Sequence, residues 1–89
     1  MSFTVLLHPK AARFLKNLER SLKVRITERL RELQESAQEK GERLMHSPFW
    51  KLRVEDYRVI YEIDRSKRRV VVLFIGHRRN VYDEFSRLM

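Results

Sequence analysis

The chain has 89 residues, with 20 Lys or Arg against 12 Asp or Glu, and its formal net charge at pH 7 is +8. This length suits one hydrophobic core, so we expect a single domain over residues 1–89. The sequence lacks cysteine, which excludes disulfide frameworks and thiol nucleophiles, and no apolar run is long enough to cross a bilayer. We therefore expect a cytoplasmic protein that does not bind membranes.

The N-terminal half predicts a strand followed by two helices. Apolar residues alternate over residues 3–7, which indicates a short strand. Pro9 suits the first position of a helix, and apolar residues follow it at helical spacing. A second helix is expected to begin with an N-cap at Ser21 and to end at Gly41. The two helices form a hairpin whose apolar stripe requires a sheet to cover it.

The C-terminal half predicts an antiparallel meander. Residues 42–48 form a polar connection, and three stretches rich in β-branched and aromatic residues follow it, at 49–54, 57–63 and 69–76. A short helix is expected within residues 77–89. The chain therefore predicts an α+β fold in which the helices pack on one face of the sheet.

Alternation along the first two meander strands gathers cations on one face. Lys51 and Arg53 share the face opposite the apolar residues of their strand. If Glu55 and Asp56 form a two-residue turn, Arg53 lies directly opposite Arg58. Like charges so placed destabilise a sheet by up to about 1 kcal/mol, so loss of Arg58 is expected to leave stability unchanged or slightly improved. We interpret the cluster as a phosphate-binding site, with a merely solvated cationic face as the alternative.

The C-terminal run adds further candidate groups. Arg78 has a planar guanidinium that can clamp a phosphate, and Tyr82 offers a ring for base stacking and a hydroxyl for hydrogen bonding. The alternative for Tyr82 is that it anchors the tail to the core. His77 carries an imidazole that can transfer protons near neutral pH. The three histidines are too widely spaced in sequence to suggest a metal site.

Two segments, Lys51–Tyr61 (KLRVEDYRVIY) and Gly76–Tyr82 (GHRRNVY), closely resemble the RelE/ParE superfamily of toxin–antitoxin toxins, on the RelE side. The similarity spans essentially the whole chain. It implies a ribosome-dependent endoribonuclease, or mRNA interferase, that needs no metal or other cofactor and inhibits translation. It also implies a RelB-like antitoxin as the inhibiting partner, and operator DNA as a further partner of the toxin–antitoxin complex.

The resemblance assigns catalytic positions to five residues of this sequence, namely Lys51, Arg53, Arg58, Arg78 and Tyr82. The implied reaction is attack by an RNA 2′-hydroxyl on the adjacent phosphorus, with cations stabilising the negative charge that develops. Arg53 stands where the best-known members carry a lysine, and an arginine stays protonated and cannot act as a base. Lys51 and His77 are therefore the alternatives for the general base.

Two other functions compete with RNA cleavage. A ParE-like toxin that inhibits gyrase shares the fold, but the combination of Lys51, Arg58, Arg78 and Tyr82 argues against it because such a toxin needs no phosphate-cleaving cluster. A non-catalytic nucleic-acid or ribosome-binding module would also explain the arginines. A cleavage assay on translated message separates this module from an enzyme.

Overall fold

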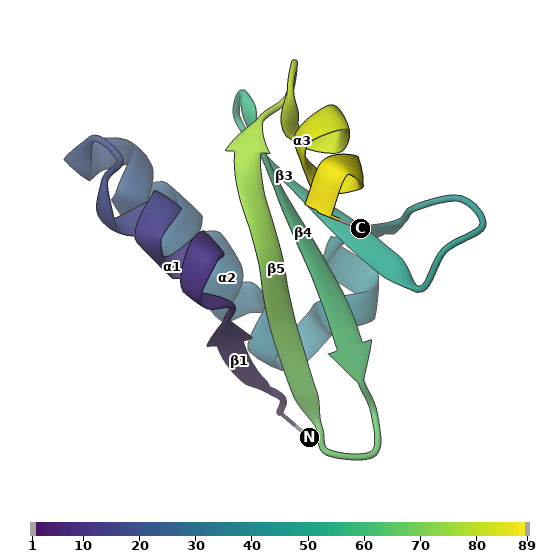
Figure 1. The fold of residues 1–89 in the computed structure, drawn as a ribbon. Coiled ribbons are helices and arrows are strands. Elements are labelled where there is room, and N and C mark those ends of the chain that lie inside the picture. The colour runs from purple at the N-terminus through teal and green to yellow at the C-terminus, as the bar shows by residue number, and fades with distance from the viewer. Residues whose placement is uncertain (1, 89) are drawn as a thin grey trace.

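The computed structural model describes residues 2–88 as a five-stranded sheet with three helices (Figure 1). The expected domain limits include Met1 and Met89, which lie outside the described residues. The elements in chain order are β1 (Thr4–Leu7), α1 (Pro9–Lys16), α2 (Arg20–Lys40), β2 (Glu42–Arg43), β3 (Phe49–Val54), β4 (Tyr57–Asp64), β5 (Arg69–His77) and α3 (Val81–Leu88). Within residues 2–88, no helix combines the length and apolar character that a membrane crossing requires.

The strands lie in the order β1-β5-β4-β3-β2. β3, β4 and β5 form the antiparallel meander that the sequence predicts, and β1 pairs with β5 in parallel. β2 pairs with the outer edge of β3, within the segment that was expected to be only a polar connection. Its two residues, Glu42 and Arg43, are both exposed, so no alternation of burial marks it in the sequence.

The two faces of the sheet have separate apolar clusters. α1 and α2 cover one face (Figure 1), where buried residues of the helices meet the inward side chains of β3, β4 and β5. This cluster includes Ile26, Leu30, Leu33, Leu52, Val59, Tyr61 and Val72. α3 packs on the other face, where Val81 and Phe85 contact Ile60 and Phe74. The expectation that the helices lie on one face therefore holds for α1 and α2, whereas α3 covers part of the opposite face.

Polar caps mark where the first two helices begin. His8 precedes Pro9, and its Nδ1 atom accepts a hydrogen bond of 3.3 Å from the Lys10 N–H. α2 begins two residues earlier than expected. Its N-cap is Glu19, whose carboxylate accepts a hydrogen bond of 3.1 Å from the Ser21 N–H and also bonds the Ser21 hydroxyl. These bonds favour the ionised carboxylate and lower the pKa of Glu19.

The end of α2 is fixed by Tyr61, a fully buried residue of β4. The helix is irregular at Ser36, and just beyond this point the Tyr61 hydroxyl donates a hydrogen bond of 2.7 Å to the Ala37 carbonyl oxygen. Gly41 follows the helix, as predicted, and a Cβ atom at this position would collide with the Tyr61 hydroxyl and lie 2.9 Å from the Lys51 carbonyl oxygen. The close approach of α2 to β3 and β4 thus requires glycine here, and it leads the chain directly into β2.

Candidate functional site

The β3–β4 hairpin has the register that the sequence predicts. Val54 pairs with Tyr57, and Arg53 pairs with Arg58, across a two-residue turn of Glu55 and Asp56. On the other side of β3, Lys51 pairs with Glu42 of β2. Because side chains of paired residues project from the same face of a sheet, these charged groups gather on the face turned away from α1 and α2.

An open cleft of about 470 Å³ lies over this face. Its walls come from β2, β3, β4, and the segment from the end of β5 into α3. The lining residues are Glu42, Lys51, Arg53, Arg58, Arg78, Arg79 and Tyr82. The cleft therefore brings together five of the six site residues predicted from the sequence.

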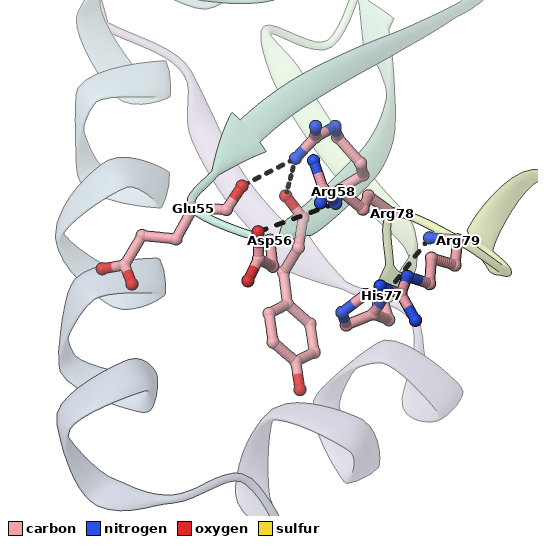
Figure 2. Close-up of polar contacts among 7 residues, drawn as sticks. Glu55, Asp56, Arg58, His77, Arg78 and Arg79 are labelled. Carbon is pink, nitrogen blue, oxygen red and sulfur yellow. Dashed lines mark hydrogen bonds and ion pairs between the residues drawn. The ribbon is translucent and has the colours of Figure 1, made fainter.

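His77 is the predicted site residue that does not line the cleft. A bulge in the β4–β5 ladder, where Ile60 pairs with Phe74 but Tyr61 pairs with Val72, resets the alternation of β5. His77 consequently shares the helix-covered face with its register partner Tyr57, and the two ring centroids are 5.4 Å apart. Its Nδ1 atom accepts a hydrogen bond of 3.2 Å from the Arg79 N–H (Figure 2). His77 therefore lies on the face of the sheet opposite the one that carries the cleft.

Arg58 is a buried cation with backbone partners. Only 8% of the residue is exposed, and its Nη1 atom donates hydrogen bonds of 2.9 Å to the Glu55 carbonyl oxygen and 2.8 Å to the Tyr57 carbonyl oxygen (Figure 2). These contacts have no signature in the sequence, because their acceptors are main-chain atoms. They remove the basis for expecting that the fold tolerates loss of Arg58, since repulsion from Arg53 is offset by two charge-assisted bonds.

Arg78 follows β5 and is held by the same turn. Its N–H donates a hydrogen bond of 2.8 Å to the Asp56 carbonyl oxygen, and its Nε atom lies 3.7 Å from the Asp56 carboxylate (Figure 2). The side chain is about half exposed, so its guanidinium remains open to a ligand. Arg58 enters the cleft from β4 and Arg78 from the segment after β5, but both contact the same turn.

Tyr82 lies in the first turn of α3 and faces Lys51. The Lys51 Nζ atom is 5.9 Å from the centroid of the Tyr82 ring, a cation–π distance. The neighbouring Val81 and Phe85 are buried and hold α3 to the sheet, whereas 37% of Tyr82 is exposed. Anchoring of the C-terminal segment is therefore carried mainly by Val81 and Phe85, and the Tyr82 ring is accessible from the cleft.

Two lining residues were not among the predicted site residues. Arg79 directly follows Arg78, and the run of two arginines was the available signal. Glu42 had no such signal, because its place depends on the pairing of β2 with β3. It brings a carboxylate into a cleft lined otherwise by cations and one tyrosine.

The cleft suits an anionic ligand that is bound and polarised by side chains. Its four arginines and one lysine can contact phosphate oxygens through charge-assisted hydrogen bonds, and Glu42 and Lys51 can move protons. Among residues 2–88, no three His, Asp or Glu side chains are grouped so that they could hold a metal ion.

Comparison with known proteins places the fold among toxins of toxin–antitoxin systems. A family model described as "ParE toxin of type II toxin-antitoxin system, parDE" matches residues 5–82. No match was found among curated proteins. The RelBE2 toxin–antitoxin complex from Mycobacterium tuberculosis contains a chain that is 26% identical to this one, with a TM-score of 0.78, and the match covers 88% of this chain and 100% of the other.

Two further solved structures share the fold at lower identity. An arginine double mutant of the E. coli toxin RelE in the free state is 21% identical, with a TM-score of 0.81 and 100% of both chains covered. A YoeB/ParE toxin from Agrobacterium tumefaciens is 15% identical, with a TM-score of 0.70, and the match covers 84% of this chain and 98% of the other.

Proposed function

This chain belongs to the ParE toxin family of type II toxin–antitoxin systems, and we propose that it acts as a RelE-like endoribonuclease that cleaves messenger RNA on the ribosome. One observation carries the proposal: five cations, a carboxylate and a tyrosine ring converge on one cleft. A gyrase-inhibiting toxin of the same fold has no need of such a cluster. The arrangement does suit a phosphodiester, which requires cations for its oxygens and proton-transfer groups for the reacting ones.

In the proposed reaction the nucleophile belongs to the substrate. The RNA 2′-oxygen forms a bond to the adjacent phosphorus and the bond from phosphorus to the 5′-oxygen breaks, which leaves a cyclic phosphate and a free 5′-hydroxyl. The intermediate phosphorane carries additional negative charge on its oxygens. Arg53, Arg58 and Arg78 stabilise this charge, and the turn of Glu55 and Asp56 holds the last two in place. Tyr82 stacks on a base next to the cleaved bond.

Two paired residues are the candidates for proton transfer. Glu42 and Lys51 are register partners and both line the cleft. In their ionised forms, Glu42 accepts the proton of the 2′-hydroxyl and Lys51 donates a proton to the departing 5′-oxygen. The alternative is that a neutral Lys51 acts as the base. Replacing Glu42 with Gln separates the two, because only the first assignment requires a carboxylate at this position.

The proposed partners follow from the family and from the charge. Several solved relatives are RelB–RelE complexes, and we infer an antitoxin of the RelB kind for this chain. Its acidic groups would complement a net charge of +8. The ribosome supplies the surface that positions messenger RNA, since so small a protein has little of its own, and operator DNA is a proposed partner of the toxin–antitoxin complex.

The test is a reconstituted translation reaction with primer-extension mapping of the message. The wild-type protein is expected to cut within the ribosomal A-site codon and to leave cyclic phosphate ends. Arg78→Ala is expected to slow cleavage roughly 100- to 1,000-fold, as for loss of one preorganised charge stabiliser. Lys67→Ala is the matched control, because it also removes one positive charge but lies in the β4–β5 turn, outside the cleft. A 2′-deoxy nucleotide at the cleaved position should block the reaction.

Three outcomes would contradict the proposal. Rapid cleavage of free RNA would show that the ribosome is not required. Intact message together with inhibited gyrase supercoiling would favour the gyrase-inhibiting toxin. Ribosome binding without any cleavage, in a protein whose expression alone is not toxic, would favour the non-catalytic binding module.

A further inference from the structure

The turn between β3 and β4 contacts two arginines of the cleft, Arg58 of β4 and Arg78, which directly follows β5. Its first residue, Glu55, offers its carbonyl oxygen to Arg58, and its second residue, Asp56, offers both its carbonyl oxygen and its carboxylate to Arg78. Figure 2 shows the guanidinium groups of Arg58 and Arg78 on the same side of this turn. The turn is therefore part of the wall that fixes where these two charges lie.

Helix α2 braces the same hairpin from the opposite face. The Arg25 Nη1 atom lies 2.6 Å from the Glu55 carboxylate, and the Arg29 Nη1 atom donates a hydrogen bond of 2.9 Å to the Arg53 carbonyl oxygen. Glu55 also has a positive φ of 54°, a conformation that residues with a side chain adopt infrequently and mostly in tight turns such as this one. The turn is thus a fixed point from which Asp56 can act on Arg78.

We propose that Asp56 is a positioning residue that orients the Arg78 guanidinium toward the scissile phosphate, an inference that rests on the proposed function. The carboxylate lies on the Nε side of Arg78, which leaves the outer nitrogens of the guanidinium free for phosphate oxygens. An ion pair this exposed contributes little to stability, so its main effect is on orientation. The Asp56 carboxylate repels a phosphate bound nearby and so weakens its binding. Orientation of Arg78 is an effect that can offset this loss of binding.

The competing explanation is that Asp56 is present because aspartate favours turns. Asp56→Asn tests this directly, because asparagine keeps the shape and the turn preference but removes the charge. We expect the maximal rate of cleavage on the ribosome to fall three- to tenfold, with KM and the melting temperature unchanged. Asp56→Glu, which restores a carboxylate, is expected to recover part of the rate. Asp64→Asn is the matched control, since Asp64 is the last residue of β4, next to the β4–β5 turn, and lies outside the cleft.

A second readout does not depend on RNA cleavage. The Nε–H group of Arg78 gives its own ¹H–¹⁵N NMR signal, and its heteronuclear NOE reports how rigidly the side chain is held. In the wild-type protein we expect a value well above that of a freely rotating arginine. Asp56→Asn should lower it to the free value, and Asp64→Asn should not change it.

These measurements separate the two proposals. If the wild-type protein leaves translated message intact, the proposed function fails, but the NMR comparison still reports whether Asp56 orders Arg78. An Arg78 signal that is equally rigid in wild type and Asp56→Asn would overturn the inference. The inference would also be overturned if Asp56→Asn lowered the cleavage rate only together with the melting temperature. The same holds if Asp64→Asn lowered the rate equally.

Discussion

Arg53 and Arg58 are direct register partners in the β3–β4 ladder, yet their environments differ completely. Arg53 is exposed, whereas Arg58 is buried and its guanidinium donates to the carbonyl oxygens of the adjacent turn. The two like charges are tolerated because Arg58 donates hydrogen bonds to main-chain carbonyl oxygens. These acceptors do not titrate, and no side-chain substitution removes them. A residue proposed to act on the substrate therefore also holds the hairpin that presents it.

The first prediction concerns these two arginines. Arg58→Ala is expected to lower the free energy of unfolding by about 1 to 2 kcal/mol, because two charge-assisted hydrogen bonds are lost and the relief of repulsion recovers only part of their contribution. Arg53→Ala, the control, should change it by less than about 0.5 kcal/mol because the side chain is exposed. Urea denaturation measures both. Equal stabilities of the two variants would mean that the carbonyl contacts of Arg58 contribute nothing.

The second prediction concerns Tyr61 and pH. Burial raises the pKa of Tyr61 from 10.0 to about 12, so folding favours the neutral phenol. Its contribution to stability is fully present below pH 10 and is lost as the pH rises through 12. Tyr61→Phe should cost about 0.5 to 1.5 kcal/mol at pH 7, because the bond to the Ala37 carbonyl oxygen is lost.

The difference between wild type and Tyr61→Phe should then shrink above pH 10, since only the wild-type protein has this phenol to ionise. Denaturant titrations at pH 7, 9 and 11 would follow the change. Tyr82→Phe is the control, because the Tyr82 hydroxyl is on a partly exposed side chain and its loss should leave stability unchanged at all three values. A constant difference across the series would contradict the assignment to Tyr61.

The third prediction concerns Arg68 in the β4–β5 turn. Arg68 is exposed and has a positive φ of 52°, which glycine adopts without strain. Arg68→Gly is therefore expected to raise the free energy of unfolding by about 0.5 to 1 kcal/mol. Lys67→Gly, one residue earlier and without a positive φ, should instead be neutral or destabilising. Thermal melts that rank the two variants in the reverse order would refute the strain assignment.

The fourth prediction concerns the attachment of α3. The Phe85 ring packs edge-on against Phe49, with the ring centroids 5.1 Å apart, and also contacts Phe74. Phe85→Ala should release α3 and carry Tyr82 away from the cleft, so that cleavage falls while β3, β4 and β5 stay folded. Hydrogen exchange should show loss of protection confined to α3. Leu88→Ala, which truncates an exposed side chain of the same helix, should preserve both protection and activity.

The sequence was sufficient for the parts of the site that depend on local rules. The turn of Glu55 and Asp56, the opposition of Arg53 and Arg58, and the shared face of Lys51 all follow from strand alternation and a two-residue loop, and the register confirms them. The packing of α3 on the second face of the sheet was only weakly indicated by the sequence. Ile60 lies on the same face as Arg58, and an apolar residue there needs something to bury it.

Other features had no local signal. Glu42 reaches the cleft only because Gly41 lets α2 approach Tyr61 closely and the chain then runs beside β3. His77 faces away from the cleft because the bulge between the pairs Ile60–Phe74 and Tyr61–Val72 shifts the alternation at the end of β5. The partners of Arg58 are carbonyl oxygens, which every residue type supplies alike. Each of these depends on tertiary geometry that residue types do not encode directly.

The parallel pairing of β1 with β5 has a consequence for the order of folding. Thr4 pairs with Arg69 and Leu7 with Val72, so the first strand of the chain has no partner strand until most of the chain has been synthesised. The meander and the helical hairpin are built from contacts close in sequence and can form first, whereas closure of β1 against β5 is a long-range step that is slow by comparison. A newly made chain thus acquires its complete sheet only late in synthesis, when β5 becomes available. Arg78, Arg79 and Tyr82, which line the cleft, follow β5 in the chain. The cleft is therefore also completed only late in synthesis.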